Sequence, residues 1–316
     1  MSSPETIPLI VIVGPTAVGK TELSIQLAER LGGEIVSADS RLFYRGMDIG
    51  TAKPTRNDRL RVPHHLIDVA DPDQVWSLAV FQEAARQAIQ AIHQRGHLPF
   101  LVGGTGQYVK AVCEGWEVPR VPPDSRLRNA LTGWAQEIGS LELHRRLAVL
   151  DPKAAETIDP SNLRRTVRAL EVILSSGQRF SDQKRQVNTG YKLLKIGLSR
   201  PRAELYARID QRIEGMIANG LIDEVRGLLA QGFSPDLPTL SAIGYREIIA
   251  YLQGLITLEE AIAQMKRQTR IFVRRQANWF KESDSNIHWF LVGDDTLHEM
   301  EEFIRRWLTS SLSAPG

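Results

Sequence analysis

Eight consecutive residues near the amino terminus have the types and spacing that bind phosphate. They are Gly14, Pro15, Thr16, Ala17, Val18, Gly19, Lys20 and Thr21, and they match the pattern G-x-x-x-x-G-K-[ST]. In such a loop the backbone N–H groups point inward, the lysine reaches the terminal phosphate, and the hydroxyl is placed to bind Mg²⁺. An apolar run precedes the loop at residues 9–13, and a helical pattern follows it over residues 21–31. The sequence therefore predicts a phosphate-binding loop with Thr21 as a magnesium ligand.

Two more polar residues follow apolar runs that are typical of buried strands. Asp39 comes directly after residues 34–38, and Thr105 follows residues 98–102 and two glycines. Ligands of parallel sheets bind beyond the carboxyl ends of the strands, where both residues are expected. An unperturbed aspartate, with a pKa of ~3.9, is ionised at pH 7, so Asp39 is able to bind a hydrated metal or to accept a proton. The structural alternatives are a turn former for Asp39 and a helix cap for Thr105.

The order of the elements predicts an α/β protein. Short apolar runs at residues 9–13, 34–38, 65–69 and 98–102 alternate with amphipathic segments at residues 21–31, 77–92 and 105–112. This alternation is typical of a parallel sheet with helices on both faces, here of the P-loop type. A proline-rich segment at residues 118–123 then interrupts it, and the periodic stretches of residues 124–186 are all helical.

The core resumes after this helical insertion domain. A strand is expected at residues 193–198, helices at 202–219, 221–231 and 258–281, and a last strand at 287–292 before a closing helix. We therefore divide the chain into a first core part (residues 1–117), a helical insertion (118–190) and a second core part (191–316).

Two helices carry basic residues in stripes. Between residues 263 and 281 there are six basic residues and no acid, and Lys266, Arg270 and Arg274 share one helical face. Like charges at this spacing destabilise an isolated helix, and an anionic partner would relieve the repulsion. The second stripe contains Arg164, Arg165 and Arg168. Solvated basic faces are the alternative, but two stripes beside a phosphate-binding loop favour RNA as a partner.

Composition sets wider bounds. The 316 residues carry a formal net charge of +2, so the overall charge does not indicate a nucleic-acid partner. The single cysteine excludes an internal disulfide and a multi-cysteine zinc site, which favours a reducing, cytoplasmic setting. The apolar run near the start is too short for a signal peptide or a membrane span. We expect a soluble, monomeric protein.

Motifs spread over nearly the whole chain resemble the tRNA dimethylallyltransferases, also called tRNA isopentenyltransferases, in the bacterial form without a zinc finger. The matching segments are residues 14–21, 37–40, 46–54, 63–68, 101–105 with Tyr108, 168–171, 243–246, and 274–276 with Trp279. The segment 48–54 is the most specific of them. The resemblance implies Mg²⁺-dependent transfer of a dimethylallyl group from dimethylallyl diphosphate to N6 of the adenosine 3′ of the anticodon.

The resemblance also implies roles for single residues. Residues 14–21 would hold the diphosphate of the allylic donor, Asp39 would act as general base, and Thr105 and Arg212 would complete the catalytic group. The tRNA anticodon stem-loop would be bound by Asp39, Ser40, Arg41, Leu42, Thr105, Arg128, Arg164, Arg165, Thr166, Val167, Arg168, Ser241, Ala242, Ile243, Gly244, Tyr245, Arg246, Arg274, Arg275, Gln276, Ala277, Asn278, Trp279, Phe280 and Lys281.

Three other functions remain open at this point. A P-loop small-molecule kinase shares the loop and the sheet but has no use for basic stripes. An adenylate isopentenyltransferase, which modifies free adenine nucleotides, shares the chemistry but needs no helical insertion. A non-enzymatic RNA-binding protein retains the stripes but does not need Lys20, Thr21 and Asp39 at one sheet edge.

Overall fold

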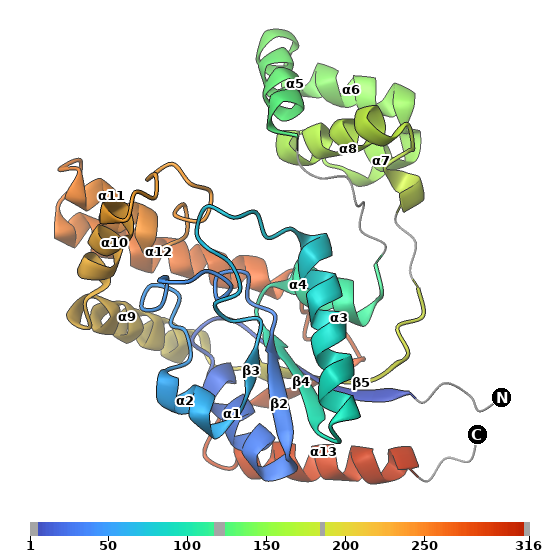
Figure 1. Ribbon diagram of the computed structural model, residues 1–316, viewed down its shortest axis with the longest axis vertical. Helices are drawn as coiled ribbons and strands as arrows, with labels where there is room; N and C mark the ends of the chain where they lie inside the picture. Colours follow the sequence, from blue (N-terminus) through green and yellow to red (C-terminus); the bar gives the residue numbers. More distant parts are fainter. Residues whose placement is uncertain (1–5, 117–123, 184–186, 313–316) are drawn as a thin grey trace. The chain divides into compact units, whose positions relative to one another are not determined.

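The computed structural model describes residues 6–116, 124–183 and 187–312. Its contacts separate two compact units: unit 1 consists of the described residues up to Cys113 and from Gly190 onward, and unit 2 of those between Glu114 and Thr189. Figure 1 shows the elements of both units. None of the helices in these ranges is long and apolar enough to cross a membrane.

Unit 1 is built on one six-stranded parallel sheet. Its strands are β1 (Ile7–Val13), β2 (Gly33–Ser37), β3 (His64–His65), β4 (Leu98–Gly103), β5 (Tyr191–Ser199) and β6 (Ile287–Leu291). They lie in the order β3-β2-β4-β1-β5-β6, so the carboxyl ends of β2, β4 and β1 are neighbours. Five apolar residues of β1, at positions 9–13, are buried at the centre of the sheet. The predicted parallel sheet is confirmed.

The third strand is much shorter than predicted. We expected residues 65–69 to be extended, but β3 ends at His65. Leu66 and Asp68 adopt left-handed backbone conformations, with φ of 62° and 56°, which interrupt the strand. An isolated bridge between Tyr44 and Ala70 is the remaining sheet-like contact of this segment.

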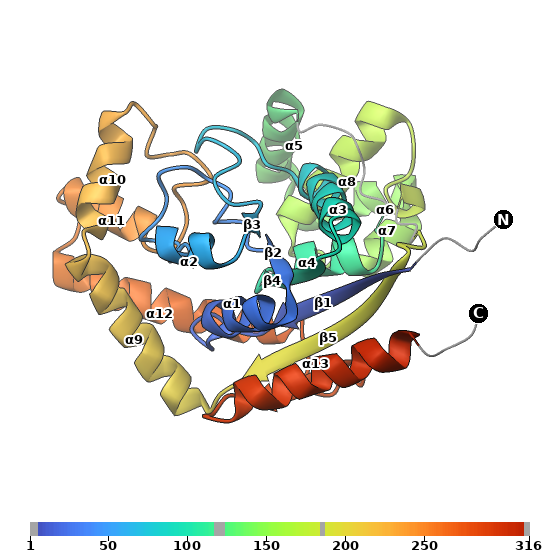
Figure 2. The ribbon, with the colours of Figure 1, turned by 60° about the horizontal axis from the view of Figure 1, so that its bottom comes forward.

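Helices cover both faces of the sheet (Figure 2). On one face, α1 (Lys20–Leu31) packs against β2, β4 and α13 (Thr296–Leu312), while α3 (Leu78–Gln94) and α4 (Gly106–Cys113) pack together against the sheet. The helix starts follow local rules; for example, the hydroxyl of Ser77 caps α3 by accepting a hydrogen bond from the Val80 N–H. Helices on both faces agree with the prediction.

A further group of helices packs side by side beyond the central strands. It comprises α9 (Arg202–Ala218), α10 (Leu221–Ala230), α11 (Tyr245–Leu252) and α12 (Leu258–Ala277). Sequence periodicity indicated α9, α10 and α12 but not α11 or the short α2 (Arg56–Arg61), because neither of these is long enough to show a clear period.

Unit 2 is a small helical unit with its own core. It contains α5 (Ser125–Ile138), α6 (Ser140–Leu150), α7 (Pro152–Thr157), α8 (Leu163–Ser176) and a 3-10 turn, η1 (Ser181–Gln183). Leu131, Leu143 and Leu170 are buried in its centre. The Val187 N–H donates to the Gly115 carbonyl at 2.9 Å, so the two ends of the unit are joined. The predicted proline-rich linker at residues 118–123 lies outside the described residues.

Candidate active site

The predicted phosphate-binding loop joins β1 to α1 with a backbone that only small residues accept. Gly14 and Gly19 have φ of 150° and 115°, and a side chain at Gly14 would begin 2.6 Å from the Leu198 carbonyl oxygen. Ala17 is also left-handed, with φ of 64°. The loop therefore curls against the end of β5, in the nest-like form that turns N–H groups toward an anion.

Lys20 is folded over this loop. Its Nζ donates to the carbonyl oxygens of Gly14 at 3.0 Å and Pro15 at 2.8 Å. Burial lowers the pKa of Lys20 to about 8; the nearby Asp39 carboxylate opposes this shift, and Arg212 adds to it. Lys20 is therefore a cation at neutral pH that neighbours both of the other charged residues predicted for the site.

Asp39 and Thr105 lie at adjacent strand ends, as expected. Asp39 follows β2 and accepts a hydrogen bond from the Arg41 N–H at 3.0 Å. The Thr105 hydroxyl, after β4, accepts one from the Ser40 N–H at 3.5 Å. Among the described residues Asp39 forms no ion pair, although the charges of Lys20 and Arg212 act on it. The structure therefore leaves the Asp39 carboxylate unneutralised beside two cations.

Arg212 reaches the loop from α9. One guanidinium nitrogen donates to the Thr16 hydroxyl at 3.4 Å and the other to the Thr51 carbonyl at 3.5 Å. Burial lowers the pKa of Arg212, and Asp39 opposes this effect. The structure thus brings Arg212 to the predicted diphosphate site. The local sequence alone did not indicate this placement, because Arg212 resembles an ordinary charged residue on the surface of a helix.

Two arginines that the sequence analysis missed also contact the loop. Arg200 donates from Nε to the Val18 carbonyl at 2.9 Å, and Arg208 donates from Nε to the Ala17 carbonyl at 2.9 Å. Two signals were present: Arg200 directly follows the predicted strand that ends at Leu198, and Arg208 lies one helical turn before Arg212. Arg208 adds positive charge around the phosphate-binding loop, whereas the charge of Arg200 is partly neutralised by Glu204.

Gln276 is buried in this structure, which argues against its predicted contact with tRNA. Its side chain is 5% exposed. The amide oxygen accepts from the Thr16 N–H at 2.9 Å, and the amide nitrogen donates to the Gly104 carbonyl at 3.1 Å. Gly104 needs to lack a side chain, because a Cβ there would lie 2.3 Å from the Gln276 amide nitrogen. Gln276 therefore ties the end of α12 to the phosphate-binding loop.

The basic stripe on α12 is partly neutralised by acids of α9. Lys266 pairs with Glu214 at 2.7 Å and Arg270 with Asp210 at 2.6 Å, so the repulsion expected from the sequence is relieved within the protein. The other four cations, Arg267, Arg274, Arg275 and Lys281, are exposed and form no ion pair among the described residues. Three of them, Arg274, Arg275 and Lys281, lie at or just beyond the carboxyl end of the helix.

Trp279 lies just beyond these arginines. Its side chain is 39% exposed, and it packs closely on the first turn of α4, where a Cβ on Gly106 would lie 2.3 Å from Trp279. One face of the ring is therefore fixed by the protein, which makes it a rigid platform for stacking.

In unit 2, two of the predicted tRNA-binding arginines serve a buried acid. Glu171 is fully buried and accepts from Arg128 at 2.9 Å, from Arg168 at 2.6 Å and from the Asp124 N–H at 2.8 Å. Removal of either arginine would leave a buried charge less compensated. Arg128 and Arg168 are therefore structural in this arrangement, while Arg164 and Arg165 are exposed on α8.

Several other members of the predicted tRNA stretches are also buried, which argues against direct contact with RNA. They are Thr166, Val167, Ala242, Gly244, Tyr245 and Phe280. Their apolar or packed side chains hold the exposed neighbours Arg165, Ser241 and Arg246 in place. Of the stretch at residues 39–42, Arg41 donates to the Thr239 carbonyl at 3.2 Å, which brings it beside the stretch at residues 241–246.

The oxygen atoms of the site suit Mg²⁺. The part of the chain that the structure describes holds no cluster of three or more His, Cys, Asp or Glu residues able to bind a metal ion. Mg²⁺ typically binds one or two protein oxygens together with substrate phosphates, rather than a cage made of protein alone. Thr21 in the first turn of α1 and Asp39 at the end of β2 supply oxygens of the right kind. This donor set fits a magnesium ion bound together with a diphosphate.

Comparison with family models agrees with this geometry. Residues 42–283 match a model described as IPP transferase, and residues 7–64 match one described as isopentenyl transferase. Among curated relatives, the tRNA dimethylallyltransferase of Roseiflexus sp. (strain RS-1) is 52% identical over 96% of this chain and 99% of its own length. That of Thermomicrobium roseum is 46% identical over 95% of this chain and 92% of its own length.

Solved structures give the same result. The full-length tRNA isopentenylpyrophosphate transferase of Bacillus halodurans is 44% identical, with a TM-score of 0.71, and the match covers 96% of this chain and 97% of that one. A eukaryotic dimethylallyltransferase acting on tRNA is 26% identical, with a TM-score of 0.75, over 95% of this chain and 78% of its own. By sequence, fold and site geometry, the chain belongs to the IPP transferase family, whose curated relatives are tRNA dimethylallyltransferases.

Proposed function

We propose that this protein transfers the dimethylallyl group of dimethylallyl diphosphate to N6 of the adenosine 3′ of the anticodon in tRNA. The observation that carries the proposal is the unneutralised Asp39 carboxylate, which lies near Lys20 and Arg212 next to the phosphate-binding loop. The near full-length similarity to tRNA dimethylallyltransferases supports the choice of donor and acceptor.

The donor diphosphate fits the cations of the loop. Lys20, Arg212 and the backbone N–H groups of residues 17–21 bind the diphosphate oxygens and stabilise the charge that grows on them as the allylic C–O bond breaks. Mg²⁺, held by Thr21 together with the diphosphate, would neutralise part of this charge. The loop thus serves as the grip on a leaving group, and the phosphates themselves are not transferred.

The acceptor amine needs a base. The N6 lone pair of adenine is delocalised into the ring, so the amine is a weak nucleophile. As N6 forms its bond to the allylic carbon, Asp39 accepts the proton that N6 loses, and diphosphate leaves. A positioned carboxylate contributes ~10²- to 10⁴-fold to such a step. The Thr105 hydroxyl accepts a hydrogen bond from the N–H of Ser40, the residue after Asp39, and this contact supports a role for Thr105 in orienting the amine.

Binding of tRNA is assigned to polar and aromatic residues of the predicted stretches that are exposed or half-buried. They are Ser40, Arg41, Arg164, Arg165, Ser241, Arg246, Arg274, Arg275, Asn278, Trp279 and Lys281. The target base is stacked in its loop and must be extruded, at a cost of a few kcal/mol, so these contacts supply the energy for extrusion. A free adenine nucleotide is the second candidate acceptor, because residues 7–64 also match the model described only as isopentenyl transferase.

The deciding experiment incubates the protein with labelled dimethylallyl diphosphate, unmodified tRNA and Mg²⁺, with AMP and ATP as competing acceptors. We expect label in tRNA alone, and label in AMP alone would overturn the proposal. Replacement Asp39→Ala should lower turnover by about 10²-fold or more while tRNA affinity stays within a few-fold. Asp294→Ala is the matched control, because Asp294 also follows a strand, β6, but at the far edge of the sheet.

A further inference from the structure

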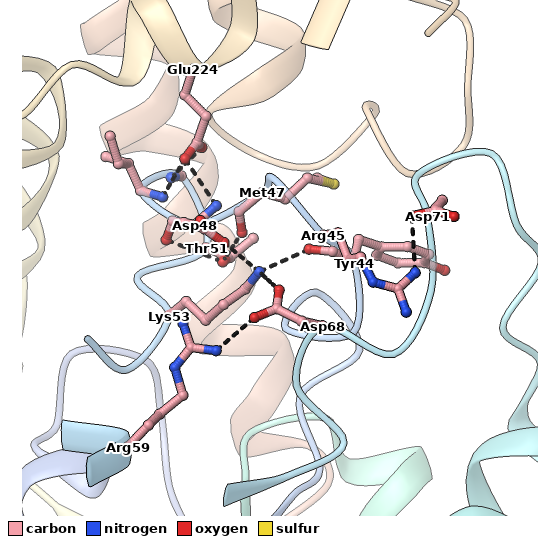
Figure 3. A network of polar contacts seen from close by, with 12 residues as sticks. Tyr44, Arg45, Met47, Asp48, Thr51, Lys53, Arg59, Asp68, Asp71 and Glu224 are labelled. Atoms are coloured by element: carbon pink, nitrogen blue, oxygen red, sulfur yellow. Dashed lines mark hydrogen bonds and ion pairs between the residues drawn. The ribbon is translucent and has the colours of Figure 1, made fainter. Parts of the chain in front are cut away.

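The segment at residues 48–53, here called the 48–53 loop, is held by an acid from a distant helix. Glu224 of α10 accepts hydrogen bonds from three successive backbone N–H groups, those of Asp48 at 2.9 Å, Ile49 at 2.7 Å and Gly50 at 3.1 Å. Successive N–H groups that converge in this way form an anion-binding nest, and here the anion is the protein's own carboxylate. Figure 3 shows Glu224 above this turn.

Tyr245 completes the attachment of Glu224. Its hydroxyl donates to Glu224 Oε1 at 2.6 Å, and its ring is fully buried. The same ring lies against Gly50, where a Cβ would be 2.5 Å from it, so this position admits only glycine. Glu224 thus has four donors, and the first half of the 48–53 loop has a fixed place.

A buried cation fixes the other end of the loop. The Lys53 side chain is 1% exposed, and its Nζ donates to the Tyr44 carbonyl at 2.8 Å and to the carboxylates of Asp48 and Asp68 (Figure 3). Arg59 also pairs with Asp68, at 2.6 Å. Each charge at this end therefore has a partner, so the loop is anchored on both sides of Thr51.

Thr51 lies between the two anchors and presents its carbonyl to Arg212. This carbonyl accepts from one guanidinium nitrogen at 3.5 Å, while Thr16 of the phosphate-binding loop accepts from the other. A long arginine loses much rotamer freedom when it is ordered, and a fixed acceptor removes that cost before the ligand binds. We propose that the 48–53 loop, through Glu224, is a positioning element that orients Arg212 toward the diphosphate of the donor.

This inference rests on the proposed function, since it assigns the diphosphate to Arg212. Its test uses inorganic pyrophosphate with Mg²⁺ as the probe, measured by calorimetry on the full chain without tRNA. Replacement Glu224→Gln puts an amide NH₂ group in the place of a carboxylate oxygen that accepts hydrogen bonds from backbone N–H groups, so at least one of these bonds is lost. We expect pyrophosphate to bind about tenfold more weakly. Asp223→Asn is the matched control: Asp223 is the preceding residue of α10, 79% exposed, and is expected to leave the affinity unchanged.

A double-mutant cycle separates positioning from general damage to the fold. In an Arg212→Ala background, Glu224→Gln should cost less than about twofold, because the residue that it orients is gone. Equal losses with and without Arg212 would overturn the inference, as would no loss in the single variant. In steady-state transfer, the KM for dimethylallyl diphosphate should rise with Glu224→Gln while the KM for tRNA does not change.

Tyr245→Phe provides a milder second variant in case Glu224→Gln does not fold. It removes one of the four donors to Glu224 and keeps the ring, so we expect a loss of about threefold that again depends on Arg212. An additive loss in this variant would also overturn the inference while leaving transfer to tRNA, and hence the proposed function, intact. A wild-type protein that fails to bind pyrophosphate would instead contradict the diphosphate assignment and the inference together.

Discussion

Two carboxylates in this protein are each close to two cations, but the cations are used in opposite ways. In unit 2, Glu171 is fully buried and bonded directly to Arg128 and Arg168. At the sheet edge of unit 1, Asp39 is half-buried and forms no ion pair among the described residues, although Lys20 and Arg212 act on it electrostatically.

The difference lies in what else the cations bind. Lys20 and Arg212 are held by oxygen atoms of the phosphate-binding loop and of Thr51, so their charge is not cancelled by Asp39. Arg128 and Arg168 give their hydrogen bonds to Glu171 itself. The first arrangement leaves positive charge available to a ligand. In the second, the positive charge is neutralised by Glu171 and stabilises the fold. Similar residue types therefore indicate a site in one unit and a structural clamp in the other.

The largest expected effect is on the clamp. Glu171→Gln removes the charge that compensates Arg128 and Arg168, and we expect it to destabilise unit 2 by about 3–5 kcal/mol. Hydrogen exchange of the α8 amides, compared with that of the β1 amides, measures this loss in unit 2 specifically. Glu142→Gln is the control, because Glu142 forms surface pairs with Arg145 and Arg146 and should change stability by no more than ~0.5 kcal/mol.

This result would also test the comparison itself. Asp39→Asn should leave the stability of unit 1 nearly unchanged, because Asp39 is not bonded to either cation. If Asp39→Asn destabilised unit 1 as much as Glu171→Gln destabilises unit 2, the two carboxylates would have the same structural role and the distinction would fail.

The second expected effect concerns two cations at the carboxyl end of α12 that no acid neutralises. The double replacement Arg274→Ala with Arg275→Ala should weaken tRNA binding by about tenfold and reduce the slope of log affinity against log salt by roughly 1 to 2. Filter binding over a salt series measures both quantities. Arg226→Ala, which removes an exposed arginine already paired with Asp223, serves as the control. An unchanged slope would return Arg274 and Arg275 to an ordinary solvated face.

A smaller effect concerns pH. Burial lowers the pKa of Lys20 to about 8, and Asp39 partly opposes this. Protonated Lys20 binds anions, so pyrophosphate affinity should fall as the pH rises through 8. In Asp39→Asn the opposing charge is lost, the pKa of Lys20 falls further, and the decline should begin at lower pH, with an effect of roughly threefold at pH 8. Titration calorimetry between pH 6.5 and 9 checks this, and Lys20→Arg should show no such decline.

The smallest effect is expected at Asp210, whose carboxylate pairs with Arg270 at a partly exposed position. Asp210→Asn should lower the stability of unit 1 by only ~0.2–1 kcal/mol, because solvent screens such pairs. The salt slope of tRNA binding should rise slightly as Arg270 becomes available. A stability loss as large as that of Glu171→Gln would place Arg270 with the structural arginines.

The fold was largely predictable because its signals are local. Apolar runs and their spacing predicted five of the strands and most helices, and the glycines of residues 14–21 predicted the loop. The strand expected at residues 65–69 was wrong because the left-handed conformations of Leu66 and Asp68 come from tertiary contacts, including the pairing of Asp68 with Lys53. Helix α11 gave no periodic signal because its eight residues span only about two helical turns, too few to show a clear period.

Local sequence patterns predicted the site residues that follow strands, whereas Arg212, which comes from a helix, was predicted only through the family resemblance. The ends of β1, β2 and β4 converge in any parallel sheet, so Lys20, Asp39 and Thr105 were expected together. Arg208 and Glu224 reach the site or its supports from α9 and α10, whose placement depends on packing that no local pattern reveals. Basic residues were the least reliable signal, since Arg128, Arg168, Lys266 and Arg270 all have acidic partners far away in sequence or hidden in the core.

The hydrogen bond between Val187 and Gly115 has a consequence for how such a chain tolerates its insertion. The entropic cost of closing a flexible loop grows with the logarithm of its length. When an insertion is compact and its two ends already meet, the core needs to close only a short loop. Unit 2 therefore adds little to the entropic cost of folding the sheet around it. As far as closure entropy is concerned, the length of unit 2 can therefore vary with little cost to the core, provided that its ends stay joined.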